Sequence, residues 1–202
     1  MKQLHTANLF SWSEFNEERN LDFHSVLWVR DQGNIIFDPL PLTPHNQKHL
    51  LSLGKVSSII ISNSDHIRDA LNIAALTGAK IVGPAAEKAE FPIECDQWLE
   101  GGEDFIADLE VFALDGSKTP GELAFVIEQT TLLTGDLIRC HQGGVLRLLP
   151  EPKLTDKAAA IASVKNLLHA IQVTSVLPGD GWPIFGNAEA VINKLLADLD
   201  NL

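Results

Sequence analysis

The sequence of 202 residues has few cysteines and no long apolar run. No apolar stretch approaches the roughly 18 residues that a membrane-spanning helix needs, so such a helix is not expected. Cys95 and Cys140 are too few and too unpatterned for a disulfide framework or a structural zinc site, and we interpret them as reduced thiols. The first residues lack the basic region and apolar run of a secretory signal. We therefore expect a cytoplasmic protein.

Basic side chains are also scarce. The chain has 15 Lys and Arg residues against 27 Asp and Glu residues, which gives a formal net charge of −12. Such a charge repels the phosphate backbone of nucleic acids, which binds basic surfaces by counterion release. Neither nucleic acid nor membrane is therefore an expected partner, which leaves a small-molecule ligand or substrate.

Strand and helix patterns alternate along the sequence. Residues 24–30 and 35–37 are predicted strands of an antiparallel hairpin, because a Gly-containing turn joins them. Thr43 is a predicted N-cap for a helix that ends near Leu53. Residues 56–61 read Val-Ser-Ser-Ile-Ile-Ile, and we interpret this largely apolar, β-branched run as a strand buried on both faces. We predict further helices over residues 68–77, 155–170 and 188–199 and further strands over residues 80–82, 109–114, 123–128, 131–133 and 174–177.

The two halves of the chain have similar patterns, with strands first and then a helix, a strand and a helix. Strands joined partly by hairpins and partly by helices favour mixed sheets with helices outside them. No linker divides the halves, and the length suits one domain. We predict a single domain over residues 1–202 of the α/β (α+β) class.

Polar residues gather in four loops that follow or precede predicted strands. Residues 59–70 read Ile-Ile-Ile-Ser-Asn-Ser-Asp-His-Ile-Arg-Asp-Ala, and residues 116–121 read Gly-Ser-Lys-Thr-Pro-Gly. Residues 133–136 read Leu-Thr-Gly-Asp, and residues 177–181 read Leu-Pro-Gly-Asp-Gly. In order and spacing these loops resemble those of the metallo-β-lactamase fold superfamily, which carry a histidine-rich dinuclear metal site. The resemblance spans almost the whole chain and implies a four-layer αβ/βα sandwich of two mixed β-sheets with helices on the outer faces.

The metal-ligand positions of this resemblance hold other residues. In the first loop, Asn63 and Asp65 stand at two of the family's histidines, Ile67 at its aspartate and Arg68 at its last histidine. Arginine has no lone pair to give and isoleucine has no donor atom, so the second metal subsite is not expected.

The other three loops continue the pattern. Lys118 stands at the histidine of the second loop and Asp180 at the histidine of the fourth. Asp136 alone matches its family counterpart, the bridging aspartate. Cationic side chains thus stand at some of the metal-ligand positions, and carboxylates stand at others. Fixed cations can neutralise buried carboxylates as a metal ion would. We predict an internal salt-bridge network of Arg68, Lys118, Asp136 and Asp180 at the former metal site; the alternative is a vestigial, solvated site.

The candidate site residues follow from this alignment. The catalytic candidates are Asp136, Asp180 and Lys118, and the candidates for a ligand-binding cleft are Asn63, Asp65, Arg68, His141 and Trp182. No cofactor is expected. The alternative is a single divalent Zn, Mn or Fe ion, whose donors would be Asp65, His66, Asp136 and Asp180.

Two functions lead the interpretation of the sequence, and a third that remains open is an interaction module that binds a partner through the acidic surface and the turn-rich residues 85–103. The first is a divergent metallo-β-lactamase-fold protein without the usual dinuclear zinc site, whose charged cleft binds a small polar or anionic ligand or serves the structure. The alternative is a hydrolase of an ester, thioester, lactone or amide, with an altered mononuclear or metal-free site. Superfamily members are often dimers, so the resemblance also leaves a homodimer open.

Overall fold

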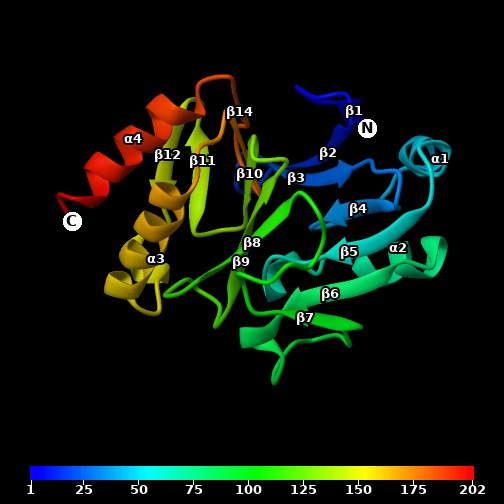
Figure 1. Cartoon of the computed structure of the whole chain (residues 1–202), viewed down its shortest axis with the longest axis horizontal. Helices are drawn as coiled ribbons and strands as arrows, with labels where there is room; N and C mark the ends of the chain where they lie inside the picture. The colour runs from blue at the N-terminus through cyan, green and yellow to red at the C-terminus, as the bar shows by residue number, and fades with distance from the viewer.

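The computed structural model describes all 202 residues and contains two β-sheets at the centre with the helices outside them (Figure 1). The first sheet has seven strands in chain order: β1 (Lys2–Gln3), β2 (Leu9–Asn16), β3 (Leu21–Trp28), β4 (Asn34–Phe37), β5 (Val56–Ile60), β6 (Lys80–Pro84) and β7 (Gln97–Leu99). The second has the order β14 (Ile184–Phe185), β13 (Ser175–Pro178), β10 (Thr131–Thr134), β9 (Glu122–Ile127) and β8 (Leu109–Leu114). A separate hairpin pairs β11 (Ile138–Gln142) with β12 (Val145–Leu148).

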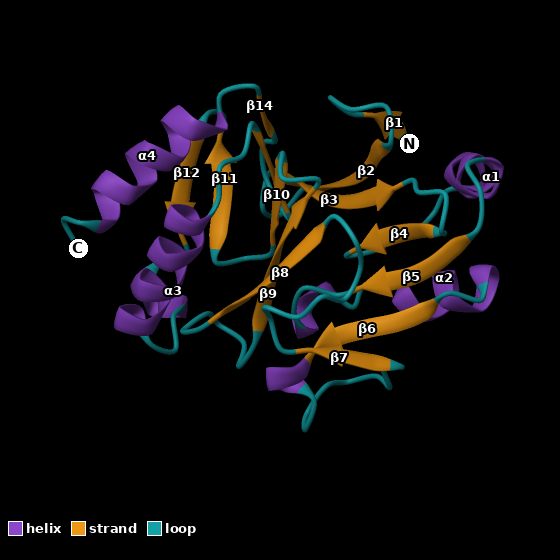
Figure 2. Cartoon of the chain, in the orientation of Figure 1, coloured by secondary structure: helices purple, strands orange, loops and turns teal.

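The helices cover the two outer faces of this pair of sheets (Figure 2). They are α1 (Pro44–Ser52), α2 (Ala70–Thr77), α3 (Lys157–Ala170) and α4 (Ala188–Leu199), with short 3₁₀ turns η1 (Ser64–His66), η2 (Ala85–Glu87) and η3 (Glu151–Lys153). Short turns make β1 to β4 antiparallel, whereas the crossovers through α1 and α2 make β4, β5 and β6 parallel. Both sheets are mixed, as expected for a four-layer αβ/βα sandwich. No helix is long and apolar enough to cross a membrane.

Strand β5 explains how the first sheet is buried on both sides. Successive side chains of a strand point to opposite faces. Ile60 packs in the cluster between the sheets with Phe37, whereas Ile59 and Ile61 pack in the outer cluster with Ile73 of α2. A third cluster, which includes residues of α3 and α4, covers the outer face of the second sheet. The isoleucines of this segment are therefore buried on both faces of the sheet, as predicted.

The helix predicted over residues 68–77 begins later, at Ala70, because Arg68 has a left-handed φ of 46° that no α-helix accommodates. Its predicted end is confirmed, with Gly78 in the left-handed conformation at the C-cap. Thr43 caps α1 as predicted, since its side chain accepts a hydrogen bond from the amide of Asn46. Asn187 precedes α4 but makes no side-chain capping bond.

Several strands were not predicted, and one of them shapes the site. Strand β2 pairs with β3 over eight residues, and the turn between them, residues 17–20, carries mostly charged side chains. The hairpin β11–β12 was also missed. Neither segment keeps a strict alternation of polar and apolar residues, since Leu9-Phe10 and Val145-Leu146 interrupt it, so the sequence gives only a weak strand signal there.

Candidate functional site

The first three polar loops meet at one side chain, Lys118, which lies between strands β8 and β9. Its Nζ atom is 2.6 Å from Oδ2 of Asp65, in η1, and 2.8 Å from Oδ2 of Asp136, which follows β10. Asp136 is buried, whereas 54% of the Asp65 side chain is exposed. Burial would lower the pKa of Lys118, but hydrogen bonds and charges of the two carboxylates raise it instead. Lys118 is therefore a fixed ammonium ion bridging two carboxylates.

His66 continues the network into the interior. Its Nδ1 atom is 2.9 Å from Oδ2 of Asp38, and its Nε2 atom is 3.5 Å from Oδ2 of Asp136. Burial alone would lower the pKa of His66, but the charge of Asp38 and the hydrogen bonds of both carboxylates raise it to about 9. At neutral pH the ring is therefore an imidazolium ion.

The two cations and three carboxylates alternate in one chain of contacts, which runs Asp65, Lys118, Asp136, His66, Asp38. His66 and Lys118 hold the pKa of Asp136 well below its usual range although burial acts the other way. Each carboxylate therefore stays ionised beside a cation, which offsets the cost of burial.

Polar neighbours complete the bonding of this chain. The amide and hydroxyl of Ser62 each donate a hydrogen bond of 2.7 Å to Asp38, and the amide nitrogen of Asn63 donates one of 3.2 Å to Asp136. Asn63 thus contacts the network from within the core, since its side chain is fully buried. It supports the site but does not line the cleft.

Arg68 plays a different part from the one predicted, because it forms no ion pair. Its Nη1 atom donates to the carbonyl oxygens of His24, at 2.5 Å, and Asp38, at 2.8 Å, and its Nη2 atom donates to that of Gly179, at 3.3 Å. The left-handed backbone of Arg68 turns the guanidinium toward these carbonyls. The predicted salt bridge of Arg68 to a carboxylate is therefore wrong. Its donors join the middle of β3 to the residues that directly follow β4 and β13.

Asp180 also lies outside the predicted network. Its Oδ2 atom is 2.9 Å from Nε2 of His141 on β11, and its Oδ1 atom has no hydrogen-bond partner although Asp180 is buried. Neither residue forms an ion pair with Lys118 or Asp136. Trp182, two residues on, is 61% exposed. The residues Asp180, His141 and Trp182 thus form a second polar group and not a wall of the cleft.

Ser62, His66 and Asp38 do not form a nucleophile triad despite their contacts. Ser62 Oγ and Asp38 Oδ2 both lie 2.9 Å from the same ring nitrogen, Nδ1. A relay needs the hydroxyl and the carboxylate on opposite nitrogens of the ring. Ser62 is moreover only 2% exposed, so no substrate carbonyl can reach it.

A cleft of about 470 Å³ opens beside this network. Its lining comes from the β2–β3 hairpin as well as from the predicted loops: Asn16, Glu18, Arg19, Phe23, Leu40, Asp65, His66, Arg68, Lys118 and Asp136. The hairpin residues were missed because β2 was missed. Three basic side chains and the protonated His66 line the cleft together with three carboxylates, and Asp38 behind the lining balances the charge of His66. The charges at the cleft therefore balance, within a chain that is strongly acidic as a whole.

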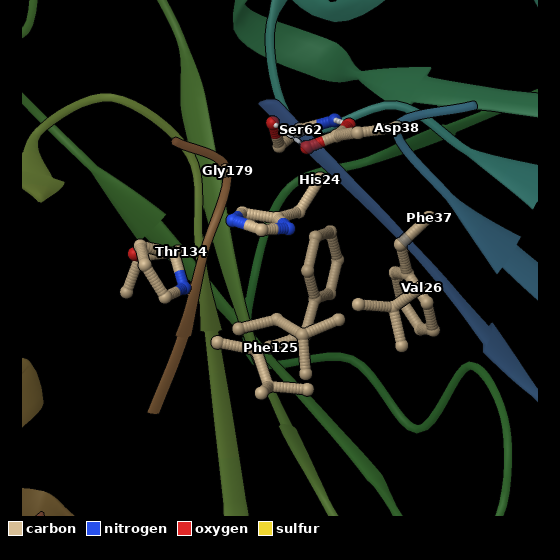
Figure 3. A pocket seen from close by; sticks show the side chains of 11 residues that line it. His24, Val26, Phe37, Asp38, Ser62, Phe125, Thr134 and Gly179 are labelled. Atoms are coloured by element: carbon tan, nitrogen blue, oxygen red, sulfur yellow. Dashed lines mark hydrogen bonds between the residues drawn. The ribbon is translucent and has the colours of Figure 1, made fainter. Parts of the chain in front are cut away.

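The space behind the network is almost filled. A cavity of about 20 Å³ lies between the sheets, with Asp38 and Ser62 at one end (Figure 3). His24, Thr134 and apolar side chains such as Val26, Phe37 and Phe125 also line it. This volume holds about one water molecule. A ligand in the cleft can therefore meet the charged chain from Asp65 to His66 but cannot pass beyond His66 to Asp38.

A family model described as the metallo-beta-lactamase superfamily matches residues 1–199. The chain belongs to this superfamily. Solved structures agree in fold: a metallo-β-lactamase from Pontibacter korlensis has a TM-score of 0.75 and 13% identity, with 99% of this chain and 98% of that chain covered. One from Erythrobacter litoralis, with β-mercaptoethanol in its active site, has a TM-score of 0.76 and 13% identity over 99% and 96%. The DIM-1 metallo-β-lactamase has a TM-score of 0.75 and 14% identity over 98% and 96%. A comparison with curated proteins finds no match.

The residues at the site do not fit the metal centre that the superfamily name implies. The structure contains no group of three or more His, Cys, Asp or Glu side chains that could hold an ion. Lys118 Nζ occupies the position between Asp65 and Asp136, where a cation bound by both would lie. The alternative donor set is also divided, because Asp180 pairs with His141 and His66 is protonated. This superfamily member carries fixed cations at the junction of its loops.

Glu122 is a further buried carboxyl that the sequence did not single out. It accepts hydrogen bonds from the hydroxyl of Ser117, at 2.7 Å, and the amide of Leu137, at 2.8 Å. Burial and then the charge of Asp136 raise the pKa of Glu122 to about 7. Glu122 and His66 therefore both titrate in a range accessible to measurement.

We expect the free energy of unfolding to be greatest near pH 5 and to fall toward pH 9. The folded pKa of Glu122 is above its unfolded value of 4.5, so stability falls as pH rises from 4.5 to about 7. The folded pKa of His66 is above 6.5, so its contribution is complete below 6.5 and is lost as pH rises through about 9. Each shift corresponds to about 3 kcal/mol. Asp38 and Asp136, whose pKa values are lowered, lose their contributions below about pH 4.

Urea denaturation at pH values from 4 to 9 measures this profile. Glu122→Gln should remove the decline between pH 5 and 7 and leave the decline between pH 7 and 9, which belongs to His66. A stability that rises from pH 5 to pH 8 in the unmodified protein would contradict both assignments.

Proposed function

We propose that this metallo-β-lactamase-fold chain binds a small polar or anionic molecule in the cleft beside Lys118, without dinuclear-zinc hydrolysis. One observation carries the proposal: the ammonium of Lys118 lies within 2.8 Å of Asp136 and 2.6 Å of Asp65, where it faces an open cleft of about 470 Å³. Lys118 has a third N–H donor beyond those two contacts, and its side chain is partly exposed. The cationic side chains of the cleft support a polar or anionic ligand, because they balance its carboxylates locally in a chain whose net charge is −12.

The alternative is a hydrolase that works without the dinuclear site, and the pair His141–Asp180 favours it. Asp180 is buried and holds Nε2 of a partly exposed His141 at 2.9 Å, so the other ring nitrogen makes no hydrogen bond within the protein. No serine or cysteine side chain contacts that ring, so the pair has no nucleophile to activate and would have to act on water. We therefore rank binding first.

We expect zinc, manganese and iron to leave the melting temperature of the protein unchanged, and a chelator likewise. A panel of ester, thioester, lactone and amide substrates should give no turnover with or without these ions. Small organic anions should raise the melting temperature by mass action. The protein should be purified without a histidine tag, so that bound metal is its own.

Two outcomes would overturn this order. Stoichiometric, tightly held metal would contradict the fixed-cation reading of the site. Turnover that His141→Gln or Asp180→Asn abolishes, while Lys165→Gln at an exposed ion pair leaves it unchanged, would establish the hydrolase instead.

A further inference from the structure

The basic side chains of the cleft differ in how many of their donors are free. Two of the three N–H donors of Lys118 contact carboxylates, and the guanidinium of Arg68 donates to three backbone carbonyls. Arg19 is the exception: its side chain forms no ion pair and donates no hydrogen bond within the protein. All five N–H donors of its guanidinium therefore remain for a ligand.

Arg19 is exposed, and two contacts limit its position. It lies in the turn between β2 and β3, and its backbone amide donates a hydrogen bond of 2.8 Å to Oδ1 of Asn16. Its Cζ atom lies 5.7 Å from the centroid of the Phe23 ring, and the Cζ atom of Arg68 lies 5.7 Å from the same centroid. Contact with an aromatic ring restricts a guanidinium and leaves its edge open to an acceptor.

The surroundings of Arg19 restrict the kind of anion. Phe23 and Leu40 are the apolar members of the cleft lining, whereas Glu18 and Asp65 are carboxylates that disfavour a highly charged ligand. The planar fork of a guanidinium matches a carboxylate with two parallel hydrogen bonds. The ligand that satisfies these groups together has one carboxylate and an apolar body.

We propose that Arg19 is the anchor of the cleft for a small organic monocarboxylate whose apolar, aromatic part lies against Phe23. This rests on the proposed function, because it assigns a ligand class and an anchoring residue to the same cleft. The β2–β3 hairpin then sets the specificity of the cleft, while Lys118 supplies a second N–H donor at its inner end.

Three probes test the proposal by NMR titration of the intact protein: phenylacetate, its neutral isostere phenylacetamide, and acetate. We expect phenylacetate to shift resonances of the β2–β3 turn, and phenylacetamide to bind at least tenfold more weakly because the charged hydrogen bonds are lost. Acetate should also bind more weakly, because it leaves Phe23 uncovered. Arg19→Gln should weaken phenylacetate tenfold or more. Phe23→Leu should weaken phenylacetate more than acetate.

Arg30→Gln is the matched control. Arg30 also stacks on an aromatic ring, with its Cζ atom 4.5 Å from the Trp28 centroid, but it lies outside the cleft. Its replacement should leave the affinity unchanged. Phenylacetate affinity that survives Arg19→Gln, with shifts at Lys118, would overturn the role of Arg19 and leave the proposed function standing. Absence of shifts at the cleft with all three probes at millimolar concentration would overturn both.

Discussion

Replacing Asp136 by asparagine is expected to lower the free energy of unfolding by about 3–5 kcal/mol, the range found when one partner of a buried ion pair is removed. Asp136 is buried and is the only residue that contacts both cations of the chain, His66 at 3.5 Å and Lys118 at 2.8 Å. The asparagine side chain has the same shape as the aspartate side chain, and its carbonyl oxygen can still accept a hydrogen bond. The expected loss therefore reports the negative charge.

The test is urea denaturation near pH 6, where His66 is fully protonated. Glu151→Gln is a suitable control, because it removes one partner of an exposed ion pair with Lys157 and should change stability by no more than about 1 kcal/mol. A second variant, Asp136→Asn combined with His66→Gln, removes one charge of each sign and should recover part of the loss. A loss below about 1 kcal/mol for Asp136→Asn would show that the charge chain does not hold the site together.

The sequence predicted the centre of the site because loop position follows from topology. Asp65, Lys118 and Asp136 lie in three loops joined to strands whose order the motifs imply, so their meeting could be anticipated. The opposite charges of Lys118 and Asp136 were also enough to predict that the two side chains would pair. What these residues do for a ligand stays a prediction until binding is measured.

The errors at the site share a physical cause: the direction of a side chain depends on backbone torsions that a motif does not encode. Arg68 was expected to face a carboxylate, but its left-handed φ of 46° directs it to backbone carbonyls. His66 was weighed only as a spare metal donor, because its partner Asp38 lies 28 positions earlier and owes its contact to a φ of 49°. Arg19 was missed with the strand that precedes it.

The charge chain also changes how this scaffold is held together. A metal ion couples the stability of a site to the free metal concentration and to chelators. Lys118 and His66 belong to the polypeptide itself, so the carboxylates of Asp136 and Asp38 are neutralised at any metal concentration. The consequence is a site whose stability responds to pH, through His66 and Glu122.

Arg68→Lys is expected to be about as damaging as the loss of Asp136, at about 3 kcal/mol or more. The guanidinium satisfies three carbonyl oxygens, those of His24, Asp38 and Gly179, which belong to both sheets. A lysine keeps the charge but cannot reach three acceptors from one position. The carbonyls of Asp38 and Gly179 keep their second donors, the hydroxyl of Ser25 and the amide of His24, but each lost hydrogen bond from the charged guanidinium costs about 1.5–3 kcal/mol. Lysine has the same steric cost as arginine at the left-handed φ of this position, so the substitution does not reduce backbone strain.

Denaturation and hydrogen exchange together separate this role from a purely electrostatic one. The His24 amide donates to the Gly179 carbonyl across the sheets at 2.9 Å, so its exchange should quicken in Arg68→Lys if Arg68 clamps that junction. Arg30→Lys is the matched control, because Arg30 donates to one carbonyl, that of Ala107, at an exposed position. An Arg68→Lys protein as stable as Arg30→Lys would contradict the clamp. Lysine would preserve a role of Arg68 that depended on its charge alone. A loss of stability in Arg68→Lys would therefore show that this position, a metal ligand in the family, here holds the backbone together through hydrogen bonds.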